Sequence, residues 1–316
     1  MKMKKLLVIA GPTASGKTAL GIALAKRLDG EIVSADSMQI YRGMDIGTAK
    51  ATAEEQAQIP HHMIDLLEPE ENYSVSRYVE DAAAVCEELF RRGKLPVVVG
   101  GTGQYIDALL AGRQFASATP EDPAVRQALY QEYERLGGEE MLEKLGSIDP
   151  ERARRLAPAD KKRIIRALEV YALTGKTISE HDEESRTLPA AYDALYVVLS
   201  YSDRARLYER IEQRVDRMFE EGLLEETRQL LKRGIPEEST CMQAIGYRQA
   251  AQVLRGELTQ EDAAASIKQA TRRYAKRQLT WFRRRENALW LEPDRMSVEE
   301  MINRIEENFR QEGAAK

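Results

Sequence analysis

The chain has 316 residues, of which 43% are hydrophobic and 31% are charged, and its formal net charge at pH 7 is −5. This composition is typical of a globular protein with one large α/β unit that carries an insertion, or with two domains, and it excludes large-scale disorder. The acidic balance argues against a protein that coats nucleic acid nonspecifically, although it allows a local basic face. No apolar run approaches the roughly 20 residues of a membrane span, so we expect a cytoplasmic protein that makes no membrane contact.

Cysteine and histidine are scarce. Cys86 and Cys241 are too few and too far apart for a disulfide framework, and we interpret them as structural thiols. His61, His62 and His181 do not have the spacing of zinc ligands. The pair His61-His62 precedes an apolar segment, and it receives no role.

A glycine-rich motif follows the first apolar run. Residues 6–10 predict a strand and residues 19–28 a helix, and between them stands Gly11-Pro12-Thr13-Ala14-Ser15-Gly16-Lys17-Thr18. This stretch fits G-x-x-x-x-G-K-[ST], in which backbone N–H groups and the positive end of the helix dipole hold phosphate oxygens. We expect Lys17 to bring a charge to the terminal phosphate and the Thr18 hydroxyl to ligate magnesium; the alternative is a tight turn with a surface lysine. A nucleotide triphosphate is the common ligand of such a loop, but any diphosphate ester offers the same oxygens.

The second predicted strand, at residues 31–34, is followed by Asp36. Ligands of open α/β sheets bind at the carboxyl ends of strands, so Asp36 should lie at the same edge as the phosphate loop. The alternative is a helix N-cap, for which aspartate is favoured. The polar, glycine-punctuated segment at residues 43–50 is a candidate mobile lid.

A crossover helix at residues 76–92 and a buried parallel strand at residues 95–99 come next. The strand ends in Gly-Gly-Thr-Gly at residues 100–103. A nucleotide hydrolase usually places a magnesium-binding acid at such a strand end, and this sequence has none there. The absence argues against a simple ATPase.

From about residue 115 to residue 191 the pattern is helical, with proline and glycine breaks, and a buried strand resumes at residues 195–200. We therefore predict an α/β fold: a P-loop NTPase-like parallel sheet flanked by helices, with an inserted all-helical domain. The core would comprise residues 1–115 and 192–316, with helices at its C-terminal end, and the insert residues 116–191. In the insert, Lys162, Arg163 and Arg166 share one side of a helix, for which a solvated face is the alternative to a binding surface.

Two later helices are rich in arginine. In residues 203–221 a ridge that can point at the phosphate site is formed by Arg206, Arg210, Arg214 and Arg217. In residues 271–285 arginines alternate with aromatic residues. That combination suits an RNA backbone with unpaired bases, although a docked helix with a solvated basic side would look the same.

Several motifs, taken together, resemble those of the bacterial tRNA dimethylallyltransferases. They are Gly-Pro-Thr-Ala-Ser-Gly-Lys-Thr at 11–18, Ser-Ala-Asp-Ser at 34–37, Gly-Gly-Thr-Gly at 100–103, Arg-Ala-Leu-Glu-Val at 166–170, Ile-Gly-Tyr-Arg-Gln at 245–249 and Ala-Lys-Arg-Gln-Leu-Thr-Trp at 275–281. The resemblance implies that the loop holds the diphosphate of dimethylallyl diphosphate. It also implies transfer of the dimethylallyl group to the N6 amine of the adenosine 3′-adjacent to the anticodon, with release of diphosphate. Mg²⁺ is the implied cofactor and the tRNA anticodon stem-loop the implied partner of a protein that we expect to be a monomer.

The resemblance also implies roles for individual residues. Asp36 matches the general base on the adenine amine, Thr102 a residue at the reaction channel and Arg214 an arginine near the diphosphate; with Thr18, which is also the expected metal ligand, they form the catalytic set. The diphosphate-binding set is Gly11, Pro12, Thr13, Ala14, Ser15, Gly16, Lys17, Thr18 and Arg214. The tRNA-binding set is Asp36, Ser37, Met38, Gln39, Thr102, Arg126, Lys162, Arg163, Ile164, Ile165, Arg166, Gln243, Ala244, Ile245, Gly246, Tyr247 and Arg248, to which the basic segment adds Arg273 and Arg277.

The sequence departs from the family pattern at two positions. Gln243 stands where some relatives carry arginine, and Gln104 where leucine is frequent. Eukaryotic relatives append a zinc finger, for which this chain lacks the cysteines. Two other functions remain open: a small-molecule or nucleoside kinase, which would convert ATP to ADP, and a noncatalytic RNA-binding protein, against which the intact Lys17-Thr18 pair and Asp36 argue.

Overall fold

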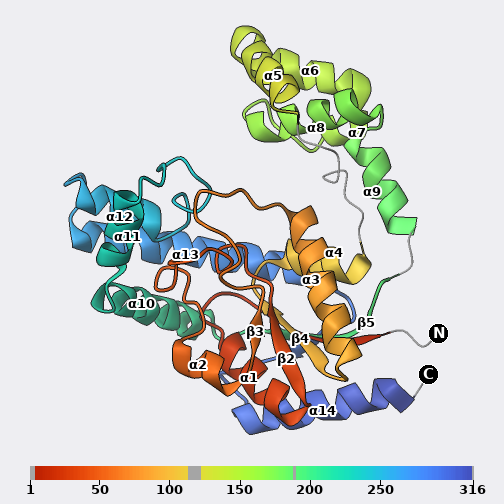
Figure 1. Cartoon of the computed structure of the whole chain (residues 1–316), viewed down its shortest axis with the longest axis vertical. Helices are drawn as coiled ribbons and strands as arrows, with labels where there is room; N and C mark the ends of the chain where they lie inside the picture. Colours follow the sequence, from red (N-terminus) through yellow and green to blue (C-terminus); the bar gives the residue numbers. More distant parts are fainter. Residues whose placement is uncertain (1–3, 113–121, 188–189, 315–316) are drawn as a thin grey trace. The chain divides into compact units, whose positions relative to one another are not determined.

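The computed structural model describes residues 4–112, 122–187 and 190–314 (Figure 1). The chain forms two compact units. The first comprises Met1–Tyr73, Glu80–Asp107 and Tyr192–Lys316, and the second comprises Ser74–Val79 and Ala108–Ala191. The predicted boundary between residues 115 and 116 lies outside the described residues, so the division at that point stays a prediction.

The first unit is built on a parallel sheet, which confirms the predicted α/β class. In the described residues the sheet has six strands in the order β3-β2-β4-β1-β5-β6. The strands are β1 (Lys5–Ala10), β2 (Gly30–Ser34), β3 (His61–His62), β4 (Leu95–Gly100), β5 (Asp193–Leu199) and β6 (Leu289–Leu291). Their neighbours pair in parallel throughout. The histidine pair is thus the edge strand itself: its backbone pairs with Ile32 and Val33 of β2.

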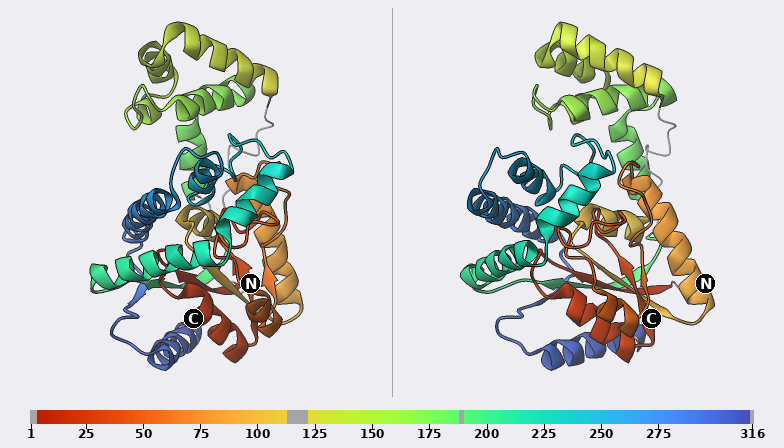
Figure 2. Two further views of the ribbon diagram at one scale, coloured as in Figure 1. Left: turned by 90° about the vertical axis from the view of Figure 1, so that its left-hand side faces the viewer. Right: turned by 60° about the vertical axis from the view of Figure 1, so that its left-hand side comes forward.

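Helices cover both faces of this sheet (Figure 2). The helices that lie wholly or mostly in the first unit are α1 (Lys17–Arg27), α2 (Ala53–Gln58), α3 (Val75–Arg91), α4 (Gly103–Ala111), α10 (Arg204–Glu220), α11 (Leu223–Lys232), α12 (Tyr247–Leu254), α13 (Gln260–Phe282) and α14 (Val298–Ala314). Helices α1 and α14 share one core with alternate residues of β5, such as Leu195 and Val197. Side chains alternate along a strand, so Tyr196 faces the other side, where its ring lies 6.5 Å from that of Phe282 in α13.

A second core joins the segment after β2 to the helices α10 to α13. Ile40, Tyr41 and Met44 are fully or almost fully buried there, together with Val215 of α10 and Tyr247 of α12. The loop that leaves the carboxyl end of β2 is therefore part of the packed interior of the unit, and the helices that follow the sheet hold it in place.

The second unit is helical in its described residues. Its helices are α5 (Pro123–Leu136), α6 (Gly138–Ile148), α7 (Pro150–Ala153), α8 (Lys161–Thr174) and α9 (Ile178–Thr187). Asp122 caps α5 by accepting hydrogen bonds from the backbone of Ala124 and Val125, with Pro123 at the first helical position, where no N–H is needed. The core includes Leu129, Met141, Leu145, Ile164 and Leu168. In the described ranges, no helix combines the length and apolar character needed to cross a membrane.

Candidate functional site

The phosphate loop of residues 11–18 connects β1 to α1, and its backbone is tightly constrained. Gly11 has φ +153°, and a Cβ atom there would come within 2.8 Å of the Leu199 carbonyl oxygen. Ala14 has φ +62°, a left-handed conformation that costs a residue with a side chain about 1–2 kcal/mol. Such strain is typical of a backbone shaped for a ligand.

The loop presents unused hydrogen-bond donors. Gly16 is the N-cap of α1 and supplies no side chain to the free N–H groups of the first turn. The Ser15 side chain is buried, and its hydroxyl has no hydrogen-bond partner within the described part of the chain. A buried unpaired hydroxyl is costly, so a ligand with acceptor oxygens would satisfy it. This arrangement fits an anion.

Lys17 lies in the same loop with its charge poorly compensated. Its Nζ atom donates to the Pro12 carbonyl oxygen at 2.7 Å. Burial and the nearby positive charge of Arg214 lower the pKa of Lys17 to about 7, and the negative charge of Asp36 opposes this shift only in part. An anionic ligand would favour the protonated form.

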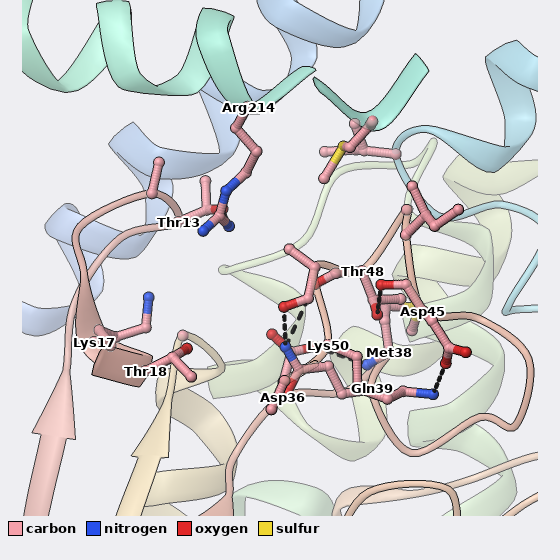
Figure 3. Close-up of a pocket in the computed structure, with 18 of the residues that line it drawn as sticks. Thr13, Lys17, Thr18, Asp36, Met38, Gln39, Asp45, Thr48, Lys50 and Arg214 are labelled. Carbon is pink, nitrogen blue, oxygen red and sulfur yellow. Dashed lines mark hydrogen bonds and ion pairs between the residues drawn. The ribbon is translucent and has the colours of Figure 1, made fainter. Parts of the chain in front are cut away.

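Two arginines of α10 contact the phosphate loop, and Figure 3 shows one of them, Arg214, reaching toward Thr13. Arg210 Nε donates to the Ala14 carbonyl oxygen at 2.9 Å, and Arg214 Nη1 donates to the Thr13 hydroxyl at 3.2 Å. Burial and the charges of Arg217 and Arg210 lower the pKa of Arg214. The predicted arginine ridge therefore faces the phosphate loop at Arg210 and Arg214.

The first arginine of the ridge does not take part. Arg206 donates to the carbonyl oxygen of Asp294 at 3.1 Å and does not line the cavity. The ridge toward the loop is shorter than the sequence pattern indicates.

Asp36 lies at the carboxyl end of β2, and its carboxylate closes a turn. Its Oδ1 atom accepts a hydrogen bond from the Met38 N–H at 2.9 Å. In the described residues the next helix is α2, which begins at Ala53, so Asp36 is not a helix N-cap. Thr102 holds the neighbouring residue: its hydroxyl accepts from the Ser37 N–H at 3.2 Å. The predicted placement of Asp36 at the edge of the phosphate loop is confirmed.

One large cavity, about 960 Å³ in volume, joins these groups. Its walls include Thr13 to Ala19 of the phosphate loop, Asp36 to Gln39, residues 45–53, and parts of α10 and α13. All of its lining residues belong to the first unit. Figure 3 shows Lys17, Thr18 and Arg214 on one side of this space and Asp36 across from them. The volume lies within the range of small-molecule binding sites.

Sequence reasoning missed the residue that locks this arrangement, Gln278 of α13. Its Oε1 atom accepts from the Thr13 N–H at 2.9 Å, and its Nε2 atom donates to the Gly101 carbonyl oxygen at 2.9 Å. The side chain thereby ties the phosphate loop to the loop after β4. The contacts join residues 265 and 177 positions apart, and no local pattern indicates them.

Tyr274, one turn earlier in α13, also lines the cavity. Burial and the negative charge of Asp36 raise its pKa to about 12. The Arg277 guanidinium lies 5.5 Å from the centre of its ring. Of the two basic residues predicted in this segment, Arg277 reaches the cavity, whereas Arg273 is exposed and is not part of its wall.

Comparison with known proteins decides the family. The model of the IPP transferase family matches residues 39–285, and that of the isopentenyl transferase family matches residues 4–65. A tRNA dimethylallyltransferase of Carboxydothermus hydrogenoformans is 46% identical over 302 residues, which is 96% of each chain. One of Geobacillus thermodenitrificans is 45% identical over 307 residues, 97% of this chain and 96% of its own. The chain belongs to the tRNA dimethylallyltransferase family.

Solved structures agree with this assignment. The crystal structure of a tRNA isopentenylpyrophosphate transferase from Staphylococcus epidermidis has a TM-score of 0.72 and 41% identity, and covers 98% of this chain and 99% of its own. A eukaryotic dimethylallyltransferase acting on tRNA has a TM-score of 0.78 and 32% identity, and covers 92% of this chain and 74% of its own.

Gln39, whose counterpart the tRNA dimethylallyltransferase resemblance places among the tRNA contacts, has its amide engaged within the protein. Its Oε1 atom accepts from the Ser34 hydroxyl at 3.1 Å, and its Nε2 atom donates to the carbonyl oxygens of Thr48 at 3.4 Å and Ala49 at 3.3 Å. Gln39 thus connects the end of β2 to the loop that forms another wall of the cavity.

The predicted contact stretch 243–248 is divided by the fold. Gln243, Ala244 and Ile245 line the cavity, and Arg248 is exposed at the start of α12. Tyr247 is fully buried, with Gly246 beside it. The accessible part of the stretch is therefore its beginning and Arg248.

The predicted contacts in the second unit also fall into two groups. Lys162 and Arg163 are exposed at the start of α8. Ile164 and Ile165 are buried at 0% and 2% exposure in the core of the unit, so their side chains serve packing.

Arg126 and Arg166 of the same unit meet at one carboxylate. Arg126 donates to Glu169 through Nε at 3.0 Å and Nη2 at 2.9 Å, and Arg166 donates through Nη1 at 2.7 Å. Burial raises the pKa of Glu169, but the hydrogen bonds from both arginines outweigh it and leave the pKa below its usual range. The two guanidinium groups are held together and partly exposed.

Proposed function

We propose that this chain transfers the dimethylallyl group of dimethylallyl diphosphate to the N6 amine of the adenosine 3′-adjacent to the anticodon in tRNA and releases diphosphate. Membership of the tRNA dimethylallyltransferase family makes it an enzyme that prenylates tRNA. The observation that carries the details is that the phosphate loop and Asp36 line the same cavity. A diphosphate bound at the loop and a base that acts on the amine would therefore share one cavity.

The donor half of the reaction needs stabilisation of the leaving diphosphate. As the bond from the first prenyl carbon to the diphosphate oxygen breaks, negative charge grows on the diphosphate. The N–H groups of the phosphate loop, the Lys17 ammonium and the Arg214 guanidinium are the groups available to hold it. The Ser15 hydroxyl, buried and without a partner in the described residues, adds a further donor.

The acceptor half needs a base, because an exocyclic adenine amine is a poor nucleophile. We assign Asp36 to remove its proton as the new carbon–nitrogen bond forms. Thr102 holds the turn that presents this carboxylate through its hydrogen bond to Ser37. The adenine must leave the anticodon stack to reach the cavity, as in other enzymes that act on a single base.

The residues at the phosphate loop fit a magnesium ion that would be bound partly by the protein and partly by the substrate. The described residues hold no group of three or more His, Cys, Asp or Glu side chains that could bind a metal alone. The Thr18 hydroxyl, the expected magnesium ligand, lies in the cavity wall beside the phosphate loop. Magnesium typically combines such a small protein ligand set with phosphate oxygens and water. When bound, the ion would neutralise charge on the diphosphate.

We assign tRNA recognition to the accessible basic residues. The exposed Lys162 and Arg163 and the pair Arg126 and Arg166 lie in the second unit, and Arg273 and Arg277 lie on α13 in the first. Phosphate contacts of this kind hold an anticodon stem-loop without reading its sequence. We expect the protein to act as a cytoplasmic monomer.

The activity is tested with unmodified tRNA, magnesium and radiolabelled dimethylallyl diphosphate, with ATP left out. The proposal predicts that label becomes acid-precipitable with the tRNA and that diphosphate appears in equal amount. A kinase would instead need ATP and produce ADP. Absence of transfer in the presence of a tRNA that a known family member modifies would refute the proposed function.

A further inference from the structure

A single carboxylate on α11 gathers the backbone of the loop that follows β2. Glu226 Oε2 accepts hydrogen bonds from the N–H groups of Asp45 and Ile46, both at 2.9 Å. Its Oε1 atom accepts from the Gly47 N–H at 3.1 Å and from the Tyr247 hydroxyl at 2.6 Å. A carboxylate offers about four acceptor positions, so these bonds occupy the whole group.

The surroundings are shaped for this contact. A Cβ atom on Gly47 would come within 2.5 Å of the Tyr247 ring, so only glycine allows the loop to approach so closely. Burial and the negative charge of Glu226 raise the pKa of Tyr247 well above its usual value, which keeps its hydroxyl a donor. Glu226 also lies in the first turn of α11, where the helix dipole stabilises a negative charge.

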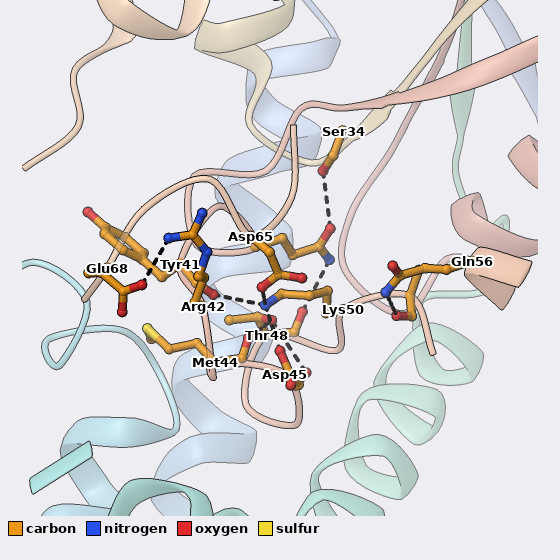
Figure 4. Close-up of polar contacts among 12 residues, drawn as sticks. Ser34, Tyr41, Arg42, Met44, Asp45, Thr48, Lys50, Gln56, Asp65 and Glu68 are labelled. Carbon is orange, nitrogen blue, oxygen red and sulfur yellow. Dashed lines mark hydrogen bonds and ion pairs between the residues drawn. The ribbon is translucent and has the colours of Figure 1, made fainter. Parts of the chain in front are cut away.

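The same loop is fastened a second time, by Lys50 (Figure 4). The buried Lys50 Nζ atom donates to the Tyr41 carbonyl oxygen at 2.8 Å and to the carboxylates of Asp45 and Asp65, both at 2.6 Å. Asp45 is therefore held by its backbone from α11 and by its side chain from Lys50.

The fastened segment is a wall of the cavity. Residues 45–53 line it, and Gln39, which hydrogen-bonds to the backbone of this segment, lies in the same turn region as Asp36. The phosphate loop is instead held by Gln278 and by the arginines of α10. The two walls thus have separate supports.

From this geometry we propose that Glu226 is a positioning residue for the tRNA side of the reaction: it fixes the 45–50 loop and thereby the wall beside Asp36. This inference rests on the proposed function for its kinetic consequence. The claim that the Glu226 carboxylate anchors the loop does not depend on the proposed function. In this proposal the Tyr247 hydroxyl donates to Glu226 inside the protein and does not contact RNA. Within the stretch 243–248, only the accessible residues would contact the tRNA.

The variant Glu226→Gln tests the anchor with little change of shape. Its amide keeps one oxygen but replaces the other with an NH₂ donor. That donor faces either the Gly47 N–H or the N–H groups of Asp45 and Ile46, so bonds are lost in both orientations. Glu225→Gln is the matched control, because Glu225 is the exposed neighbour on the same helix turn and pairs with Arg228.

Hydrogen exchange of peptides that contain residues 45–47, measured by mass spectrometry without substrates, reads the anchor directly. We expect exchange at least about tenfold faster in Glu226→Gln than in the wild type, and unchanged exchange in Glu225→Gln. Tyr247→Phe, which keeps the carboxylate and removes one donor, should give a smaller increase and serves if Glu226→Gln does not fold. Wild-type exchange rates in both Glu226→Gln and Tyr247→Phe would overturn the anchor.

Steady-state kinetics test the positioning role. We expect Glu226→Gln to lower kcat/KM for tRNA by about tenfold or more and to leave the affinity for dimethylallyl diphosphate within about twofold of the wild type. If the affinity for dimethylallyl diphosphate falls as much as kcat/KM for tRNA, the inference that the two walls have separate supports is overturned. If the wild-type protein transfers no prenyl group, the proposed function fails, while the exchange experiment still decides whether Glu226 anchors the loop.

Discussion

At the scale of single residues, the positive charges around the phosphate loop lack a compensating anion when no ligand is bound. Burial and the charge of Arg214 lower the pKa of Lys17 to about 7, so the ammonium of the free protein loses its proton far more readily than an exposed lysine does. Burial and its arginine neighbours also lower the pKa of Arg214, although its guanidinium stays charged at neutral pH. Both shifts are opposed by a bound anion, so binding of a diphosphate and protonation of Lys17 are linked.

This linkage predicts a pH dependence of donor binding. Because the bound diphosphate favours protonated Lys17, binding takes up a proton above pH 7, and the affinity should fall toward tenfold per pH unit as the pH rises from about 7 to 9. Lys17→Met should bind more weakly at pH 7 but lose this slope. The measurement is the dissociation constant of dimethylallyl diphosphate by calorimetry for both proteins. Ionisation of the ligand is common to both, so parallel slopes would contradict the shifted Lys17 pKa.

Asp36 gives a second prediction at this scale. Asp36→Asn keeps an oxygen to accept the Met38 N–H and therefore the turn, but it cannot take a proton. Single-turnover transfer with both substrates saturating should slow by roughly 10²–10⁴, as is typical for loss of a general base. Binding of tRNA and of the donor should persist. A rate within about threefold of the wild type would assign deprotonation to water or to the departing diphosphate instead.

At the scale of secondary-structure elements, α13 is the support of the donor site. The buried Gln278 holds the Thr13 N–H and the Gly101 carbonyl, so Gln278→Met, similar in size, would leave both groups unpaired. We expect a loss of about 2 kcal/mol in the free energy of unfolding and a weaker affinity for dimethylallyl diphosphate. Lys276→Met, at an exposed position of the same helix, is the control for urea unfolding and ligand binding. Unchanged donor affinity in Gln278→Met would show that the phosphate loop keeps its shape without α13.

Some of the elements that build the site can be predicted from the sequence, and others cannot. The buried strands and the phosphate loop follow from short-range patterns: a continuous apolar run, a glycine motif and the start of a helix. Asp36 was placed correctly because the carboxyl ends of parallel strands share an edge. The supports Gln278 and Glu226 were not predicted, because each pairs with backbone about 180 or more positions away, and the backbone of any residue type offers the same groups.

Burial explains the other differences between sequence and structure. Ile164, Ile165 and Tyr247 lie within motifs that match tRNA contacts, yet each is buried in the core of its own unit. A motif marks a stretch, whereas helical geometry turns its successive residues to different sides. The two-residue strand β3 is too short for any pattern, since it depends on pairing with β2.

At the scale of the whole molecule, tRNA binding is assigned to both compact units, and salt dependence tests whether both take part. Arg163 of the second unit and Arg273 of the first are exposed. Each alanine substitution should weaken tRNA binding and reduce the slope of log affinity against log salt by about one, because each phosphate contact releases a counterion. Donor affinity should stay unchanged.

The control for this experiment is Arg91→Ala. Arg91 is an exposed arginine in an i,i+3 ion pair with Glu88, as Arg163 is with Asp160. If the Arg163 and Arg273 variants keep the wild-type salt slope, these residues belong to solvated faces. If only one variant changes it, only that one of the two arginines contacts a tRNA phosphate.

The central claim is that this enzyme joins a prenyl group to one exocyclic amine of tRNA. The most direct test compares two transcripts of the same tRNA, one with adenosine and one with inosine 3′-adjacent to the anticodon, since inosine differs by lacking that amine. With labelled dimethylallyl diphosphate and no ATP, the account predicts one dimethylallyl group per adenosine-containing tRNA, located at that nucleoside by mass spectrometry, and none on the inosine transcript. Label on the inosine transcript, or at another nucleotide, would contradict it.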